Sequence, residues 1–344
     1  MKTHLINLTL LCSIYFVAST LAAAAPKPVK VFILAGQSNM EGKAKMSLLE
    51  YQVKQPGTRP LFAHFEKDGK WIERDDVWIK FLDRKGPLTV GYGSPNCIGP
   101  ELQFGWTMGD HYREPVLLIK TAWGGRSLWR DFRSPSAGQP PDATLQSLLA
   151  DAQKKRPETT LDVIKQTFGA SYRAMLAEVN AVLAGPAAQF PALAGLKPEV
   201  AGFVWFQGWN DMINADATAA YADNLAHFIR DVRKDFKSPK LPFVVVQMGV
   251  DGLEPGDGVK RFKAAQAAGA GLAEFKGNVA LVKSDAFWDV EAATVFKKGW
   301  RENIDEWNKV GSDYPFHYLG SAKTLCAIGK ASAEAVLELC GEKK

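Results

Sequence analysis

The chain has 344 residues, of which 47% are hydrophobic and 23% are charged, and its formal net charge at pH 7 is +5. These values are ordinary for a soluble protein with a large core, and we expect one large domain rather than two. Basic and acidic residues alternate, as in residues 231–236 (DVRKDF), so no basic block indicates nucleic-acid binding.

Residues 1–25 have the features of a secretory signal peptide. Lys2 supplies the positive start, residues 5–21 are mostly apolar, and the alanines that follow fit the small-residue cleavage pattern. We expect cleavage after Ala24, because cleavage one residue later would leave a proline at the new terminus. The alternative is an uncleaved membrane anchor, which the polar residues within the apolar run disfavour. The mature protein is therefore expected to be periplasmic or secreted, without membrane contact.

Apolar runs and amphipathic patterns then alternate along the chain. The predicted strands cover residues 29–35, 115–120, 200–206, 243–248 and 279–282. The predicted helices cover about 160–184, 216–235, 259–275 and 321–339. Stretches at about 44–95 and 130–158, rich in Pro and Gly, are predicted to be loop-rich insertions. This order is typical of α/β proteins, so we predict a three-layer α/β/α sandwich around a doubly wound, five-stranded parallel sheet of flavodoxin-like type.

The first predicted strand leads into a candidate nucleophile. Residues 36–40 read GQSNM, so Ser38 follows the carboxyl end of a buried strand. An open α/β sheet presents a nucleophilic serine to its crevice at this place, although a plain strand-to-helix turn gives the same pattern. Serine is inert at its ordinary pKa and needs a nearby base.

His317 is the best candidate for that base. His64 lies in an irregular insertion, and His111 and His227 are predicted on helices, where surface or packing roles are expected. His317 lies in an aromatic-rich loop immediately before the last helix, and such a loop can hold an imidazole still. Asp313, four residues earlier, is the local acid that could orient the ring.

Two other strand ends offer donors for an oxyanion, which acyl transfer requires. Residues 123–127 (WGGRS) place a diglycine directly after the second strand, where a backbone N–H can approach a substrate closely. Asn210, just after the third strand, offers a side-chain amide. A tight turn and an Asx-type cap are the simpler alternatives for these two features.

Taken together, these segments resemble a known superfamily. GQSNM, Gly125, GWND at 208–211 and the loop around His317 are similar, in order, to the four blocks of the SGNH (GDSL-like) hydrolases. The forms GQSNM, WGGRS and WFQGWND are more narrowly similar to the sialate O-acetylesterase and acetyl xylan esterase branch. The resemblance covers about residues 29–340, within a domain that we place at 26–344 with the two insertions.

The resemblance implies an exported carbohydrate esterase that removes O-acetyl groups from acetylated carbohydrate, with neither metal nor cofactor. Ser38 would form the acyl-enzyme and His317 would move the proton. The oxyanion hole would comprise the backbone N–H groups of Ser38 and Gly125 and the side chain of Asn210. The neighbouring residues that could belong to the substrate site are Gln37, Gly124, Gln207, Trp209 and Asp211.

The residues depart from the superfamily pattern at the partner of His317. The final acid usually precedes the histidine by three residues, but position 314 is Tyr and Asp313 lies one residue further back. Many members of this branch carry Glu where Trp209 stands here. The ring of His317 could therefore be oriented by Asp313, by Asp211 or by a backbone carbonyl.

Two other functions fit the same fold: an esterase or lipase for non-sugar acyl esters, and a degenerate hydrolase that only binds carbohydrate. Trp and Tyr residues near the predicted site suit sugar rings, and no long aliphatic lid is evident. A pure binder has no need of Ser38, Asn210 and His317 together. The spacing of His and Cys indicates no metal site. Three cysteines follow the predicted leader: Cys97, Cys326 and Cys340. A disulfide between Cys326 and Cys340 would need the end of the last helix to unwind. The sugar, the ester position and the oligomeric state stay open.

Overall fold

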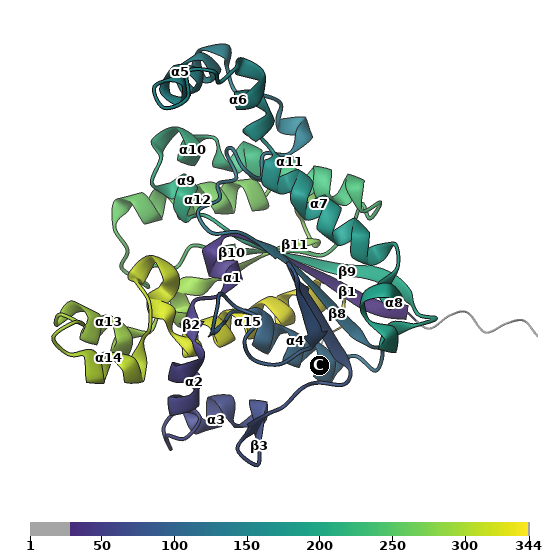
Figure 1. The fold of residues 1–344 in the computed structure, drawn as a ribbon, viewed down its shortest axis with the longest axis vertical. Coiled ribbons are helices and arrows are strands. Elements are labelled where there is room, and N and C mark those ends of the chain that lie inside the picture. The colour runs from purple at the N-terminus through teal and green to yellow at the C-terminus, as the bar shows by residue number, and fades with distance from the viewer. Residues whose placement is uncertain (1–27, 343–344) are drawn as a thin grey trace, which may run out of the picture.

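A mixed sheet of seven strands lies at the centre of the structure, a computed structural model that describes residues 28–342 (Figure 1). In spatial order its strands are β11 (Val279–Lys283), β10 (Phe243–Gln247), β9 (Lys197–Phe206), β1 (Pro28–Gly36), β8 (Val116–Ala122), β5 (Val77–Phe81) and β6 (Arg84–Pro87). All neighbours pair in parallel except β6, which is antiparallel to β5. Every residue of β8 is buried, as expected for a parallel strand covered on both faces.

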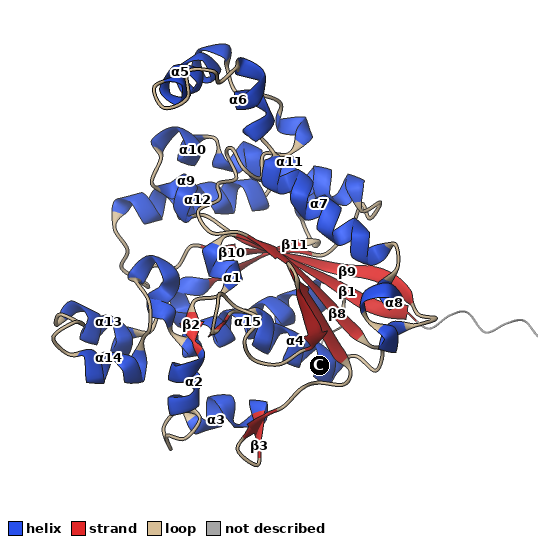
Figure 2. Ribbon diagram, in the orientation of Figure 1, coloured by secondary structure: helices blue, strands red, loops and turns tan. Residues whose placement is uncertain are grey.

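Helices cover both faces of this sheet (Figure 2). One layer contains α4 (Glu101–His111) and α15 (Ala322–Leu339), which pack side by side. The opposite layer contains α7 (Ala170–Leu183), α11 (Tyr221–Asp235) and α12 (Asp257–Ala270). The apolar side chains of both layers and of the sheet join in one large core. The predicted three-layer α/β/α sandwich is therefore confirmed.

The sheet has two strands more than predicted. The five predicted strands correspond to β1, β8, β9, β10 and β11, and the additional β5 and β6 lie within the segment predicted as a loop-rich insertion. β5 alternates buried and half-buried side chains, and charged residues precede and follow it, so its apolar signal is weak. β6 is an edge strand that ends at Pro87, a residue that sheets tolerate at an edge. The prediction of a five-stranded, wholly parallel sheet was wrong in this respect.

The remaining elements of residues 44–100 are short. They are β2 (Ala44–Lys45), α2 (Met46–Gln52), α3 (Arg59–Phe62), β3 (Glu66–Lys67), β4 (Lys70–Trp71) and β7 (Cys97–Ile98). The insertion predicted at 130–158 contains α5 (Asp142–Gln153). α5 packs with α6 (Leu161–Thr167) around a small apolar cluster of its own, at the top of Figure 1.

The predicted helices are present, although two of them are divided. The helix expected at 160–184 is broken into α6 and α7 at Gly169, whose φ of 72° is left-handed. The helix expected at 216–235 comprises α10 (Ala215–Ala219) and α11. Helices that were not predicted include α9 (Trp209–Met212), α13 (Val290–Lys297), α14 (Ile304–Val310) and the short α8 (Pro186–Gln189).

Some predictions concern residues that the structure does not describe. The predicted signal peptide at 1–25 lies outside the described residues. Within the described part of the chain, no helix combines the length and apolarity that a bilayer crossing requires. The cysteines Cys97, Cys326 and Cys340 are free thiols.

Candidate active site

Three strands end in register at one edge of the sheet. Gly36, the last residue of β1, pairs with Ala122 of β8 and with Phe206 of β9. A Cβ at Gly36 would lie 2.1 Å from the Phe206 carbonyl oxygen, so only glycine allows the two strand ends to approach this closely. The segments that follow these strands therefore start side by side, as the chemistry of a shared crevice requires.

Ser38 and His317 meet at this edge. Ser38 is the first residue of α1 (Ser38–Glu41) and is 5% exposed. Its Oγ lies 2.9 Å from Nε2 of His317, and Nδ1 of His317 lies 3.0 Å from Oδ1 of Asp313. The structure thus brings the three predicted catalytic residues into one chain of hydrogen bonds, with Asp313 as the ring's partner. Such a chain can move a proton from a hydroxyl to an imidazole whose tautomer the acid fixes.

The carboxyl group of Asp313 is set to stay ionised. Burial acts to raise its pKa, but hydrogen bonds from the His317 ring and the Tyr314 N–H, with the charge of Lys43, outweigh that effect. The pKa of Asp313 therefore lies below its ordinary value. An ionised carboxylate at this place would stabilise an imidazolium on His317.

The backbone that follows His317 is strained. Tyr318 and Leu319 have φ angles of 52° and 61°, in the left-handed region that side chains disfavour. Tyr318 is fully buried, and its hydroxyl accepts from the Gly249 N–H at 2.9 Å and shares a hydrogen bond of 2.7 Å with Ser284. These contacts hold the loop in a conformation that it would not adopt alone.

Asn39 ties the two halves of the site together, and sequence reasoning did not assign it a role. Its side-chain NH2 donates to the backbone oxygen of Phe316 at 3.1 Å. Residues 39 and 316 are the chain neighbours of Ser38 and His317, so this bond restrains the distance between the Ser38 and His317 side chains. Its position within the GQSNM segment was the available signal.

The Asn210 side chain is oriented by Gln37. Nε2 of Gln37 donates to Oδ1 of Asn210 at 3.1 Å, while Oε1 of Gln37 accepts from the Gly208 N–H at 3.0 Å. Because the amide oxygen of Asn210 is engaged, its NH2 group is turned away from Gln37 and has no hydrogen-bond partner within residues 28–342. Gln37 itself is 2% exposed, so it supports the site from below rather than contacting a ligand.

Asp211 is also part of this support, which corrects two predictions. It is fully buried, and its carboxylate accepts from the backbone N–H groups of Leu128 and Trp129, both at 2.8 Å, and from Gln207 at 2.6 Å. Burial raises its pKa to about 7, against the opposing effect of these three hydrogen bonds. Asp211 therefore neither orients His317 nor contacts substrate. Gln207, 2% exposed, is likewise part of the interior.

Replacing Asp211 with Ala should destabilise the protein. The N–H groups of Leu128 and Trp129 would lose their acceptor, and leaving such groups unpaired costs about 1–3 kcal/mol each. Gln207 would lose one of its hydrogen bonds as well. We expect the free energy of unfolding to fall by about 3 kcal/mol or more, measured by denaturant titration. Asp216→Ala, at an exposed position on α10, is the control and should change little. Unchanged stability of Asp211→Ala would contradict the structural role.

The diglycine after β8 is held by an acid that the sequence reasoning missed. Gly125 is exposed and has a φ of 71°, in the left-handed region that favours glycine. The N–H of Gly124 donates to Oε1 of Glu41 at 2.6 Å. Glu41, at the end of α1, also accepts from Lys43 at 2.8 Å and from Ser94 at 3.0 Å. The N–H of Gly124 therefore already has a hydrogen-bond acceptor within the protein.

Trp209 is half-buried and packs on Phe316 with ring centroids 5.4 Å apart.

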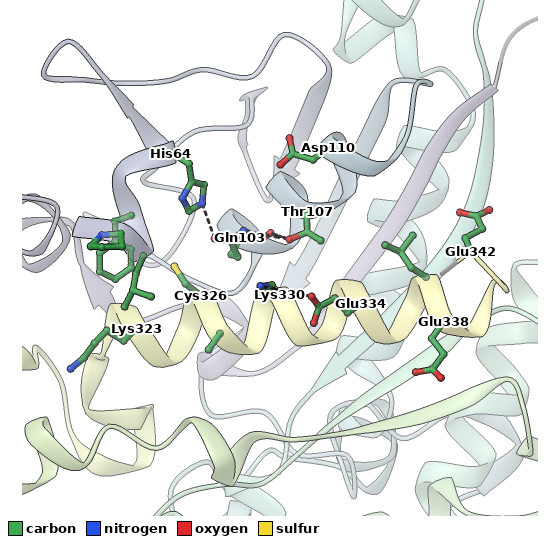
Figure 3. A pocket seen from close by; sticks show the side chains of 15 residues that line it. His64, Gln103, Thr107, Asp110, Lys323, Cys326, Lys330, Glu334, Glu338 and Glu342 are labelled. Atoms are coloured by element: carbon green, nitrogen blue, oxygen red, sulfur yellow. Dashed lines mark hydrogen bonds and ion pairs between the residues drawn. The ribbon is translucent and has the colours of Figure 1, made fainter. Parts of the chain in front are cut away.

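The other histidines of residues 28–342 lie elsewhere. His64 bonds to Gln103 at 2.9 Å in a separate groove between α4 and α15 with a volume of about 830 Å³ (Figure 3). His111 pairs with Glu342, and His227 with Ser136. No group of His, Cys, Asp and Glu within residues 28–342 is arranged to hold a metal ion.

Comparison with known families identifies the chain. Residues 28–291 match the family described as carbohydrate esterase, sialic acid-specific acetylesterase. The protein belongs to this carbohydrate esterase family. The predicted resemblance is confirmed, and the family assigns the chain to hydrolases of acetyl esters on carbohydrate. The matched range contains Ser38, Gly125 and Asn210 and ends before Asp313 and His317.

One solved structure with a TM-score above 0.5 supports the fold of this esterase. A protein from Arabidopsis thaliana is 16% identical with a TM-score of 0.51, over 90% of this chain and 98% of that one. A carbohydrate acetylesterase from Xanthomonas citri (13% identity, TM-score 0.44, 91% and 57% covered) and NanS (16%, 0.41, 75% and 78%) are more distant. No curated protein matches the sequence.

Proposed function

We propose that this carbohydrate esterase removes O-acetyl groups through an acetyl-enzyme on Ser38. The observation that carries the proposal is the hydrogen-bonded chain from Ser38 through His317 to Asp313 at the crevice edge of the sheet. A serine needs such a base to act as a nucleophile, and a base needs such an acid to hold its ring.

The reaction would proceed in two steps. Oγ of Ser38 attacks the acetyl carbon while Nε2 of His317 accepts its proton, and Asp313 stabilises the resulting imidazolium. The imidazolium then returns the proton to the departing sugar oxygen, which leaves as a hydroxyl group. A water molecule then attacks the acetyl carbon while His317 accepts its proton. The imidazolium passes that proton to Oγ of Ser38 as acetate leaves, which restores the free enzyme.

Three N–H groups are suited to stabilise the oxyanion of both steps. The N–H of Ser38 lies in the first turn of α1, where backbone donors have no partner within a helix. The N–H of Gly125 follows the strand end, and the NH2 of Asn210 is free of Gln37. Donors fixed before the reaction are effective because they need no reorganisation as charge develops.

Asn210→Ala should lower kcat by about 100- to 1000-fold, as expected for one oxyanion-hole donor. The value of KM should change little, because the bond strengthens only as charge builds on the acyl oxygen. The loss of the bond to Gln37 should cost about 1 kcal/mol of stability, so kinetics and thermal midpoint are both measured.

The matched control for Asn210→Ala is Asn214→Ala. The Asn214 side chain caps α10 by accepting from the Ala217 N–H at 2.9 Å, and the residue is exposed. Its replacement should cost about 1 kcal/mol of stability and leave kcat unchanged. A destabilised Asn210→Ala protein with normal turnover would reject the oxyanion-hole role.

The proposal is tested by acetate release from p-nitrophenyl acetate, acetylated xylan and O-acetylated sialic acid. Release from at least one carbohydrate ester at a higher kcat/KM than from the small ester supports carbohydrate deacetylation. Preference for p-nitrophenyl acetate over both carbohydrate esters would favour an esterase for non-sugar acyl esters. Binding of carbohydrate without acetate release would indicate a degenerate enzyme.

We also propose that the esterase is exported through cleavage after Ala24. The charged start, apolar run and alanine-rich end of residues 1–25 support this proposal. Sequencing the amino terminus of protein recovered from periplasmic and extracellular fractions tests it, and a mature chain that retains residues 1–25 would contradict it.

A further inference from the structure

A second hollow opens beside the candidate active site, at the carboxyl end of β5. It has a volume of about 550 Å³ and, with the turn between β5 and β6, is lined by Glu41, Met46, Leu82, Asp83, Ser94 and Asn96. Because β5 runs parallel to β8, this hollow lies at the same edge of the sheet as the diglycine that follows β8. We refer to it as the β5–β6 pocket.

Glu41 connects the β5–β6 pocket to the catalytic groups. It lies one helical turn after Ser38 in α1, and its Oε1 accepts from the N–H of Gly124, next to the proposed oxyanion donor Gly125. Its Oε2 accepts from Ser94 and Lys43. One carboxylate thus contacts the diglycine with one oxygen and a pocket-lining residue with the other, so a ligand in the pocket would lie next to the acyl site.

The walls of the pocket are fixed before any ligand binds. Lys120, 1% exposed, donates to the Glu41 carbonyl oxygen at 2.7 Å and to that of Tyr92 at 2.6 Å, and it pairs with buried Glu101 at 2.8 Å. Arg84 donates to two further carbonyl oxygens of the same loop, at 2.6 and 2.5 Å. Two cations therefore tie α1, β8 and the β5–β6 hairpin to the loop, and a preformed site loses less free energy on binding.

The lining suits a sugar ring. The Asp83 carboxylate can accept hydrogen bonds from sugar hydroxyl groups, and Asn96 can both donate and accept. The Ser94 hydroxyl already donates to Glu41, whose carboxylate also accepts from Gly124 and Lys43, so these two residues mainly shape the wall of the pocket. Met46 and Leu82 supply apolar surface for the C–H face of a ring. A few placed polar groups within an apolar lining are the usual composition of a small-molecule site.

The charges of the lining disfavour an acidic sugar. Arg84 is the one cation among the pocket-lining residues of the described chain, and its guanidinium is used by carbonyl oxygens. Lys43, close by, is paired with Glu41. Asp83 is exposed and forms no ion pair within residues 28–342, so its charge faces the pocket uncompensated. A sugar carboxylate would meet repulsion there rather than a partner.

We propose that the β5–β6 pocket binds an uncharged sugar ring of the substrate whose acetyl ester lies at Ser38. The esterase would then prefer neutral acetylated carbohydrate to O-acetylated sialic acid. This inference rests on the proposed function, because it takes Ser38 as the nucleophile, and it goes further by assigning the sugar's binding site and charge.

The test measures kcat and KM of the full-length esterase for three esters: p-nitrophenyl acetate, an acetylated xylo-oligosaccharide and O-acetylated sialic acid. Asp83→Asn keeps the shape of the turn and removes the charge. It should raise KM for the neutral oligosaccharide about tenfold, as expected for a lost hydrogen bond to a charged group, with kcat for p-nitrophenyl acetate unchanged. Asp83→Lys should also raise kcat/KM for the sialic acid ester.

Asp75→Asn is the matched control, because Asp75 is an exposed acid of the same insertion that does not line the pocket. It should change no parameter. Normal turnover of p-nitrophenyl acetate shows that a variant is folded. If Asp83→Asn does not hydrolyse p-nitrophenyl acetate, Asn96→Ala provides a second variant, which should also raise KM for the oligosaccharide.

Two results would overturn the inference: unchanged KM for the oligosaccharide in both pocket variants, or a wild-type preference for the sialic acid ester. These differ from a failure of the proposed function. If Ser38→Ala still hydrolyses p-nitrophenyl acetate, the nucleophile is wrong. If that hydrolysis requires Ser38 while the pocket variants behave as wild type, only the sugar site is wrong.

Discussion

Ser38→Ala should abolish the esterase activity, with a loss in kcat of about a millionfold, as for the nucleophile of a well-studied serine hydrolase. The side chain is 5% exposed, and its Oγ makes one hydrogen bond, of 2.9 Å, to His317. Removing that oxygen leaves the backbone of α1 in place, so the thermal midpoint should shift little. Acetate release and thermal unfolding of the same preparation separate loss of chemistry from loss of fold.

Covalent labelling provides an independent test of this nucleophile. A serine-directed acylating inhibitor should modify Ser38 in the native protein and not Ser127, the serine after the diglycine. Ser127 is already engaged, because its Oγ donates to Asp131 at 3.0 Å and accepts from the Arg130 N–H at 3.1 Å. Ser127→Ala should accordingly keep its activity. Labelling of Ser127 in place of Ser38 would reject the assignment.

The parts of the fold that could be predicted are those with strong local signals. The strands β1, β8 and β9 each contain an apolar run, and α15 is amphipathic over its whole length. β5 was missed because it lies near an edge of the sheet and alternates its burial, so its residues resemble a polar loop. The break at Gly169 was missed because the apolar spacing continues across it.

The candidate site divides in the same way. Ser38, Gly125 and Asn210 follow strand ends, and parallel strands bring their carboxyl ends together whatever the details of packing. The burial of Asp211 depends on contacts with Leu128 and Trp129, more than 80 residues away in the chain, and no local pattern indicates it.

Lys120 shows where a local signal was present but not used. It is a charged residue in a strand whose other positions are mainly apolar, and such a side chain must find partners within the protein. Its partners are the Glu101 carboxylate and two carbonyl oxygens, one of them in α1 behind Ser38. A lysine within a buried strand therefore pointed to a polar interior network next to the nucleophile.

Asp313→Asn should lower kcat by about four orders of magnitude, by analogy with the acid of well-studied triads. In the structure Oδ1 of Asp313 faces Nδ1 of His317 at 3.0 Å, which fixes Nε2 as the acceptor for the Ser38 proton. An Asn side chain can donate to Nδ1 and would thereby favour the tautomer with its proton on Nε2. That tautomer cannot accept the proton of Ser38, and the charge that stabilises the imidazolium is lost as well.

The size of this loss decides between a triad and a dyad. If a backbone carbonyl sufficed to orient His317, Asp313→Asn should lower kcat by about tenfold or less. A loss of that size is typical when a residue that only supports a functional group is replaced. Asp285→Asn is the matched control, since Asp285 is a partly buried acid paired with Lys263 away from His317, and its turnover should be normal. A near-normal kcat for Asp313→Asn would require the dyad. A loss of about 10⁴ with an unchanged thermal midpoint would assign to Asp313, one residue further from the histidine than the superfamily's usual acid, the full role of that acid.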